Sequence, residues 1–354
     1  MKKIALVGCG AIAKTYGLII QELGYVCVGV TDISPEAAKR FSQKYPELRA
    51  DWLTHPDWVS AEKRAELRAK FDEPAVYSDL DALIEGTVPD VVIVGTWPGS
   101  HAELVCRSAE KGVPAIICEK PMALSESECS VMVDTCEQQN ARLAVCHDSC
   151  VLMPQFKLAR EMISEGQIGE VEFIRANTSS TLMDWSVYLW AAMHYLLPDH
   201  PVTLINAAMD CRKQAEAFGH IQEDHSTIHF RMKDGLSGIL LTGQKVTTAH
   251  GIRIDGKAGS LEVSFLRAPM LRVWKEGDKN WETLVPPRTC LYDERRAFVK
   301  GVAEDDPDFR RFYGASASVP SRLVFAAWQS YFQRQPVELS RPVSFAIPKH
   351  WEMI

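Results

Sequence analysis

Two glycines near the start of the chain have the spacing of a phosphate-binding turn. Gly8 and Gly10 follow the apolar run Ile4–Val7 and precede a helical pattern over Ala11–Glu22. Glycine at the first position permits a tight turn, glycine at the second lets the backbone approach a pyrophosphate, and the small Ala13 keeps helix and strand close together. Because N–H groups at a helix N-terminus bind phosphate, the stretch predicts a dinucleotide site. The residues expected at the cofactor are Gly8, Gly10, Ala11, Ile12 and Ala13.

An acidic residue follows at the distance expected of a ribose ligand. The second apolar run, Val26–Val30, ends shortly before Asp32, which stands 22 positions after Gly10. Dinucleotide-binding units place such an acid about 20 residues after the glycines. A carboxylate accepts hydrogen bonds from a ribose diol and repels a 2′-phosphate, and the next residues, Ile33 and Ser34, supply no arginine for that phosphate. The sequence therefore favours NAD over NADP, and a glycine-rich loop without a ligand is the alternative.

A lysine stands where a nicotinamide and a substrate would be within reach. Lys120 follows the apolar run Ala115–Cys118 within the tripeptide Glu119-Lys120-Pro121. Ligands of open α/β sheets bind at the carboxyl ends of parallel strands. This position favours a functional lysine over a solvated surface lysine.

A carboxylate and a phenol are spaced to act together. Asp184 and Tyr188 are four positions apart, which places them on one face of a helix. An ammonium group beside the phenol stabilises the phenolate and lowers the phenol pKa from its usual value of about 10. Tyr188 is thus a candidate proton donor, and Asp184 is a candidate to bind a substrate hydroxyl or orient the tyrosine. An N-cap aspartate and a packing tyrosine are the alternative interpretation.

The elements that carry the first of these residues alternate between strand and helix up to about Asp148. The apolar runs lack polar alternation, which is typical of a parallel sheet covered on both faces. The expected strands are Ile4–Val7, Val26–Val30, Val91–Val94, Ala115–Cys118 and Leu143–Cys146. The expected helices are Ala11–Glu22, Pro35–Tyr45, Asp79–Ile84, His101–Lys111 and Ser125–Gln139. Residues 49–74 interrupt this order, either as a surface embellishment or as a lid or subunit contact.

The pattern changes from about Ser149. Several alternating runs follow one another without intervening helices, which favours an open antiparallel sheet. These runs are Gly169–Thr178, Val202–Met209, Ser226–Met232, Ser237–Thr242, His250–Ile254, Gly259–Val263 and Leu271–Trp274. The helical patterns are Met153–Ile163, Trp185–Leu197, Tyr292–Ala303 and Ser318–Phe332. We therefore expect two α/β domains, residues 1–148 and residues 149–354.

Composition excludes several classes of function. The net charge is −7 without a basic tract, so nucleic acid is not an expected partner. The apolar stretch before Cys9 is too short for a secretion signal, and no run of about 18 apolar residues predicts a membrane span.

The ten cysteines suit free thiols in a reducing, cytoplasmic compartment. No Cys-x-x-Cys pair is present, and His225 and His229 on one strand would lie about 13 Å apart, so no metal site is expected near them or His220.

The ordered motifs resemble the glucose–fructose oxidoreductase and inositol dehydrogenase family. The resemblance rests on Gly8-x-Gly10-x-x-Ala13, Thr96-Trp97-Pro98-Gly99-Ser100-His101, Glu119-Lys120-Pro121 and Gly166-Gln167-Ile168-Gly169-Glu170-Val171. It implies an N-terminal Rossmann domain and a C-terminal α/β domain with a large, mostly antiparallel open sheet. It also implies an NAD(P) cofactor contacted by Thr96, Trp97, His101, Glu119 and Lys120, with His101 capping or packing nearby. Homodimers or homotetramers would form through the C-terminal sheet.

The same resemblance implies a reaction. Cyclitol dehydrogenases of the family carry Asp-x-x-x-His in the second domain, whereas the branch with aldose and dihydrodiol dehydrogenases carries tyrosine, as Asp184-x-x-x-Tyr188 does here. Lys120 would polarise the carbonyl or alcohol oxygen, Tyr188 would be the acid/base, and Asp184 would assist. The implied substrate is a sugar, sugar derivative, polyol or diol. Trp97-Pro98, Ser186 and the missing arginine before Pro154 depart from the family pattern and leave the substrate open.

Two other functions stay possible at this stage. One is a non-catalytic NAD-binding sensor or regulatory protein on the same scaffold, because fold alone does not determine function. The other is a cyclitol-type dehydrogenase that uses His194, although Asp184 pairs in spacing with Tyr188 and not with His194.

Overall fold

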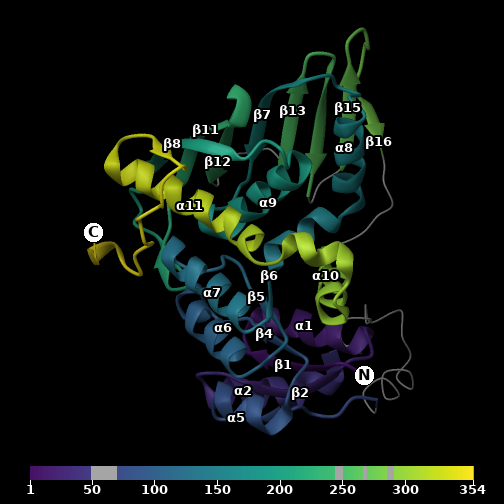
Figure 1. Cartoon of the computed structure of the whole chain (residues 1–354), viewed down its shortest axis with the longest axis vertical. Coiled ribbons are helices and arrows are strands. Elements are labelled where there is room, and N and C mark those ends of the chain that lie inside the picture. The colour runs from purple at the N-terminus through teal and green to yellow at the C-terminus, as the bar shows by residue number, and fades with distance from the viewer. Residues whose placement is uncertain (49–69, 244–249, 266–268, 285–290, 354) are drawn as a thin grey trace. The chain divides into compact units, whose positions relative to one another are not determined.

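A computed structural model describes residues 1–48, 70–243, 250–265, 269–284 and 291–353 (Figure 1). The predicted interruption at 49–74 therefore falls mostly outside the described residues. The chain divides into two compact units. Unit 1 comprises Met1–Glu119, Val131–Cys146 and Arg295–Ser316, and unit 2 comprises Lys120–Ser130, His147–Glu294 and Ala317–Ile354. Lys120, expected within the N-terminal 148 residues, thus groups with unit 2, and the chain leaves unit 1 immediately before it.

Unit 1 is built on a six-stranded parallel sheet in the order β3-β2-β1-β4-β5-β6. The strands are β1 (Lys3–Val7), β2 (Val26–Thr31), β3 (Ala75–Val76), β4 (Val91–Val94), β5 (Ala115–Cys118) and β6 (Arg142–Val145). This is the strand order of a dinucleotide-binding Rossmann sheet, with the switch point between β1 and β4. Every residue of β4 and β5 is buried, as the uninterrupted apolar runs predict for a sheet covered on both faces.

The helices of the N-terminal half agree with the predicted ones to within a few residues. They are α1 (Ala11–Glu22), α2 (Pro35–Lys44), α5 (Leu80–Thr87), α6 (His101–Glu110) and α7 (Glu126–Gln138). Local chemistry explains where α2 starts. Ser34 accepts a hydrogen bond from the Ala37 N–H, and Pro35 occupies the first helical position, where its missing N–H costs nothing.

Unit 2 contains a nine-stranded sheet in the order β16-β15-β14-β13-β7-β12-β11-β8-β17. Only β7 and β12 pair in parallel, so the sheet is mostly antiparallel, as predicted. Its strands are β7 (Val171–Asn177), β8 (Val202–Asp210), β11 (His225–Met232), β12 (Ser237–Gly243), β13 (Gly251–Gly256), β14 (Gly259–Ser264), β15 (Leu271–Lys275), β16 (Glu282–Leu284) and β17 (Val337–Glu338). A separate short hairpin joins β9 (Glu216–Ala217) and β10 (His220–Ile221).

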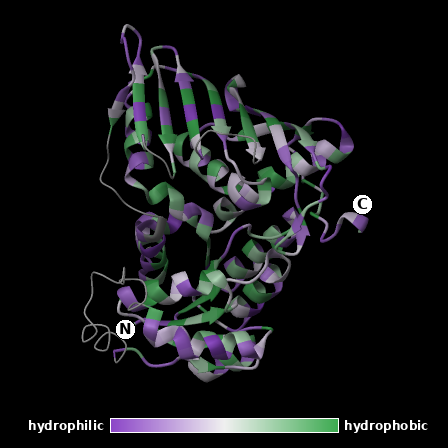
Figure 2. Ribbon diagram, turned by 180° about the vertical axis from the view of Figure 1, so that it is seen from behind, coloured by the Kyte–Doolittle hydropathy of each residue, from purple (hydrophilic) through white to green (hydrophobic). Residues whose placement is uncertain are grey.

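The strands of this sheet have one buried side and one more exposed side. Burial alternates residue by residue along β11, and Figure 2 shows the matching alternation of hydrophilic and hydrophobic residues on these strands. Helices α8 (Pro154–Ser164) and α9 (Val187–Leu196) contact β14 and β13. Aromatic pairs fill the layer between helices and sheet: the rings of Trp190 and Phe230 lie 5.2 Å apart, and those of Phe156 and Phe265 lie 4.6 Å apart.

The last long helices are α10 (Leu291–Glu304) and α11 (Ala315–Gln333), close to the two predicted C-terminal helices. Within the described ranges, no helix combines the length and the apolar character that a membrane crossing requires. No disulfide joins any two of the nine cysteines that the structure describes. Cys27, Cys118 and Cys146, which lie in or beside the strands of unit 1, are buried, and Cys9 in the glycine turn is half-buried.

Candidate active site

The glycine turn has the backbone that a pyrophosphate needs. Gly8 has φ +92°, and a Cβ there would lie 2.8 Å from the backbone C and O atoms of Gly95, so no other residue fits without a shift. Gly10 is the N-cap of α1 and supplies no side-chain cap, and a Cβ at Gly10 would meet no atom within 4 Å. The first turn of α1 contains no acidic residue. The turn therefore leaves open space and a positive helix end for an anion.

Asp32 links the end of β2 to that turn. Its Oδ2 accepts a hydrogen bond from the Cys9 N–H at 2.7 Å, and its Oδ1 accepts one from the Ser34 N–H at 2.8 Å. Each carboxylate oxygen has two lone pairs, so both can accept a further hydrogen bond. The carboxylate is thus held at the edge of the glycine turn in a form suited to a ribose diol.

The segment after β4 carries three of the residues implied by the family resemblance. His101 is fully buried, and its Nε2 lies 3.0 Å from the carbonyl oxygen of Thr96; its place near a cofactor stays a prediction. The Ser100 hydroxyl donates to Thr96 Oγ1 at 2.8 Å. The side chain of Trp97 is 64% exposed and presents a large apolar surface.

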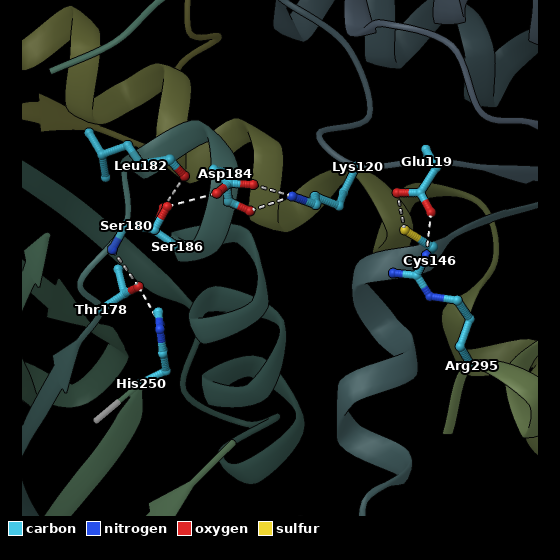
Figure 3. Close-up of polar contacts among 10 residues, drawn as sticks. All are labelled: Glu119, Lys120, Cys146, Thr178, Ser180, Leu182, Asp184, Ser186, His250 and Arg295. Carbon is cyan, nitrogen blue, oxygen red and sulfur yellow. Dashed lines mark hydrogen bonds and ion pairs between the residues drawn. The ribbon is translucent and has the colours of Figure 1, made fainter. Parts of the chain in front are cut away.

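Glu119, at the carboxyl end of β5, is held by residues of unit 1. Its Oε1 accepts hydrogen bonds from the Tyr16 hydroxyl and from Arg295 Nη1, each at 2.7 Å, and its Oε2 accepts one from the Cys146 thiol at 2.9 Å. Figure 3 shows the contacts with Arg295 and Cys146. Burial, followed by the charge of Glu119, raises the pKa of Tyr16 well above its ordinary value. The carboxylate and Arg295 form a buried ion pair that fixes the end of β5. Contact of Glu119 with a cofactor stays a prediction.

Lys120 is the next residue, and the structure brings it to Asp184. Its Nζ donates to Asp184 Oδ1 at 2.5 Å and to the Asp184 backbone carbonyl oxygen at 2.9 Å. Figure 3 shows the lysine pointing at the Asp184 carboxylate and at the Asp184 backbone carbonyl oxygen. The lysine and aspartate side chains are 18% and 29% exposed, so the pair lies partly out of water but stays accessible.

Asp184 lies in a single π-helical turn, Leu182–Ser186, that runs directly into α9. Its second oxygen, Oδ2, accepts a hydrogen bond from the Ser180 hydroxyl at 2.7 Å. Burial alone would raise the pKa of this carboxyl group, but the charge of Lys120 and the hydrogen bonds from Lys120 and Ser180 bring the pKa below its ordinary value. Asp184 is therefore ionised at neutral pH, and its charge is matched by the Lys120 ammonium.

Tyr188 lies one helical turn after Asp184, and its ring lies close to the Lys120 ammonium group. It is 6% exposed, and Lys120 Nζ lies 5.5 Å from the centroid of its ring. The Trp185 ring packs beside it, with the centroids 5.0 Å apart. Lys120 is far from Asp184 and Tyr188 in the sequence. The fold nevertheless brings the three residues into one cluster in unit 2. An ammonium group this close to an aromatic ring is in cation–π range.

Two histidines stand next to this cluster. His220 is 1% exposed, and its Nδ1 lies 2.8 Å from the carbonyl oxygen of Ile221. Burial lowers the pKa of His220, while the nearby charges of Asp184 and Lys120 act on it in opposite directions. The sequence carries no signal for the position of His220 beside Asp184, because His220 comes from the separate β9–β10 hairpin.

His250 is held on both sides of its ring. Its Nδ1 lies 2.6 Å from Thr178 Oγ1, its Nε2 lies 3.2 Å from Ser179 Oγ, and its ring lies 4.2 Å from that of Trp185. By contrast, among the described residues no hydrogen bond or ion pair joins His194 to Lys120 or Asp184. Burial lowers the pKa of His194.

Comparison with known proteins agrees with the fold of unit 1. Residues 2–147 match the Gfo/Idh/MocA model, described as an oxidoreductase family with an NAD-binding Rossmann fold. Over this segment the chain is similar to that family. The resemblance predicted from the sequence motifs is thereby confirmed, whereas the assignment to its tyrosine-containing branch stays a prediction.

Curated relatives match this chain over part of their length. An uncharacterized oxidoreductase of Streptococcus pneumoniae is 37% identical over 151 residues, 42% of this chain and 38% of the relative. Inositol 2-dehydrogenase of Pseudomonas fluorescens is 24% identical over 266 residues, 72% of this chain and 66% of the relative. The matched part thus spans less than two thirds of either relative.

A solved structure extends the comparison to the whole fold. An inositol dehydrogenase homolog from Azotobacter vinelandii, complexed with NADH and myo-inositol, superposes with a TM-score of 0.75 at 16% identity. The superposition covers 95% of this chain and 97% of that structure. The two-part α/β architecture is therefore shared along nearly all of the chain.

Proposed function

We propose that this protein is an NAD-dependent oxidoreductase that transfers a hydride between nicotinamide and a hydroxyl-bearing carbon of a sugar, sugar derivative, polyol or diol. The observation that carries the proposal is the cluster of Lys120, Asp184 and Tyr188, which begins two residues after the end of the Rossmann strand β5. An ammonium, a carboxylate and a phenol together can bind an alcohol oxygen and move its proton.

The proposed cofactor is NAD, because the residues of unit 1 suit it. Gly10 and the uncapped start of α1 would hold the pyrophosphate, and Asp32 would accept hydrogen bonds from a ribose diol. When bound, NAD supplies the hydride acceptor, and the protein orients it and manages the proton. The negative charge of Asp32 would repel a 2′-phosphate, so NADP is less favoured.

The proposed proton chemistry follows from the charges in the cluster. Lys120 would donate a hydrogen bond to the alcohol or carbonyl oxygen and stabilise negative charge that develops there. Tyr188 would take up or return the hydroxyl proton, aided by the ammonium group 5.5 Å from its ring centroid. Asp184 would hold Lys120 in place, because its carboxylate is ionised and bound to Nζ.

The proposed substrate class rests on the relatives and on the site. The matched relative from Pseudomonas fluorescens is named an inositol 2-dehydrogenase, and the solved homolog holds myo-inositol. Ser180, Asp184 and the half-buried Trp185 offer hydroxyl partners and an aromatic face, which suit a polyhydroxylated ring. A cyclitol is therefore a member of the panel to be tested, although His194 has no described bond to the cluster.

The experiment is a screen of purified full-length protein with NAD and NADP against sugars, polyols, cyclitols and diols, followed by absorbance of the reduced cofactor. We expect turnover with NAD and at least one polyhydroxylated substrate, and loss of that turnover in Lys120→Ala. Tight NADH binding without turnover of any compound would favour the non-catalytic sensor instead.

We also propose that the protein forms a homodimer or homotetramer through the less buried side of the nine-stranded sheet. Partly exposed apolar residues, Phe173, Ile239 and Leu241, stand on neighbouring strands there beside Arg175, whose side chain is 52% exposed. Apolar residues at the centre of an exposed face are typical of subunit interfaces.

Light scattering should give a mass of two or four chains, and Ile239→Glu should lower that mass. A wild-type monomer would contradict the proposal.

A further inference from the structure

The helix that carries Asp184 and Tyr188 has an unusual N-terminus. It begins with the π-helical turn Leu182–Ser186 after the N-cap Thr181, whose side chain makes no capping hydrogen bond. The N–H groups at the start of a helix need acceptors, and buried ones need them most. Here the acceptor comes from elsewhere in the chain: the Leu182 N–H donates to Glu223 Oε1 at 2.7 Å.

Glu223 is itself buried and held from a second side. It is 1% exposed and stands between β10 and β11. Its Oε1 also accepts a hydrogen bond from Thr242 Oγ1 at 2.8 Å, and Thr242 Oγ1 lies 2.8 Å from Ser226 Oγ on the adjacent strand. Glu223 thus connects the rigid pair of strands β11 and β12 to the first residue of the π-helical turn.

The position of that turn matters for Lys120. Asp184 binds the ammonium group through its backbone carbonyl as well as through its carboxylate. A side chain can adjust its rotamer when its backbone moves, but a carbonyl oxygen cannot. A displacement at Leu182, two residues earlier, would therefore shift one of the two oxygens that hold Lys120. Ser186 reinforces the same turn, because its hydroxyl donates to the Leu182 carbonyl at 2.6 Å.

We propose that Glu223 is a positioning residue that fixes the Asp184 turn and thereby the place of the Lys120 ammonium in the reaction given under Proposed function, on which this inference rests. Among the described residues no hydrogen bond or ion pair joins it to Lys120 or Asp184, and it acts through the Leu182 N–H. In the described part of the chain its second oxygen, Oε2, is buried without a hydrogen-bond partner. Burial raises the pKa of Glu223 to about 7, so a neutral side chain of the same shape can replace it.

The test compares three variants of the full-length protein. Glu223→Gln keeps an oxygen acceptor for Leu182, Glu223→Leu removes it at similar volume, and Thr242→Val removes the other hydrogen bond to the same oxygen. We expect kcat to fall at least 10-fold in Glu223→Leu while KM for NAD stays within 2-fold, because the glycine turn and Asp32 are untouched. Glu223→Gln and Thr242→Val should keep kcat within about 3-fold of the wild type.

A second readout does not depend on turnover. Lys120 is modified with trinitrobenzenesulfonate, and its labelling rate is followed by peptide mass spectrometry. Labelling should become at least 3-fold faster in Glu223→Leu and stay unchanged in the other two variants. Unchanged kcat and labelling in a folded Glu223→Leu protein would overturn the inference, as would equal losses in Thr242→Val. If the wild type turns over no substrate, the proposed function fails, and the labelling rates alone decide the role of Glu223.

Discussion

The ammonium of Lys120 is bound by two oxygens of a single residue, the carboxylate Oδ1 of Asp184 at 2.5 Å and its backbone carbonyl at 2.9 Å. This double contact fixes the lysine in a way that one flexible ion pair does not. These two contacts use two of the three ammonium protons. The arrangement suits a lysine that donates a directed hydrogen bond, and it ties the chemistry to the backbone of the Asp184 turn.

Removing the ammonium group should stop the chemistry and spare the cofactor. Lys120→Ala is expected to lower kcat/KM by at least about 100-fold, the contribution of a well-placed proton-handling group, because the developing charge on the substrate oxygen loses its partner. NADH affinity, measured by fluorescence titration, should change little. Lys111→Ala is the matched control, since Lys111 forms a surface ion pair with Glu85. Near-normal turnover in Lys120→Ala would exclude this lysine from the mechanism.

The Tyr188 hydroxyl can be tested without disturbing its ring. Tyr188→Phe keeps the aromatic face that lies 5.5 Å from Lys120 Nζ and beside Trp185, but it removes the proton. We expect kcat to fall by about 100-fold or more, with a melting temperature within a few degrees of the wild type. The pH profile of kcat should lose the limb that reports the acid/base group. A Phe variant with full activity and an unchanged profile would assign the proton transfer to another residue.

Much of unit 1 could be predicted because its signals are local. The bounds of β4 and β5 follow from runs of apolar residues, and the glycine turn and Ser34 cap act through their own neighbours. The two-residue strand β3 has too short a pattern to detect, and its edge position comes from pairing with β2. The parallel pairing of β7 and β12 within an otherwise antiparallel sheet likewise has no local signal.

The candidate site was predictable in its residue types but not in its contacts. Lys120 and Asp184 are 64 positions apart, and the carbonyl contact between them depends on a π-helical turn that the four-residue spacing of Asp184 and Tyr188 does not indicate. His220 lies in a short hairpin, and Glu223 lies in the residues that follow it. Their burial beside the Asp184 turn depends on tertiary packing, which local sequence patterns do not indicate. The buried pair of Glu119 and Arg295 is also tertiary, since these residues are 176 positions apart.

The ion pair of Lys120 and Asp184 should stabilise the fold in a pH-dependent way. The pKa of Asp184 is lowered in the folded state from its ordinary value of 3.8, so the stabilisation is present above about pH 4 and is lost as the pH falls through the lowered value. Asp184→Asn is expected to cost about 1–3 kcal/mol at pH 7, because a charged hydrogen bond is replaced by a neutral one. Urea unfolding at pH 7 and pH 3 should show this difference shrinking. A difference that is equal at both pH values would mean that the carboxylate charge contributes nothing.

Cofactor preference depends on Asp32, whose two oxygens also accept the Cys9 and Ser34 N–H groups. Asp32→Asn removes the charge and keeps one of the two oxygen acceptors, at the cost of one backbone contact. We expect NAD to bind about 10-fold more weakly, because a charge-assisted hydrogen bond to a ribose diol is worth about 1.4 kcal/mol more than a neutral one. NADP should bind as well as before or better, since the repulsion of its 2′-phosphate is gone. Paired titrations of both cofactors give the ratio of dissociation constants. If that ratio is the same in the variant and the wild type, the ribose is recognised elsewhere, and the preference for NAD does not come from Asp32.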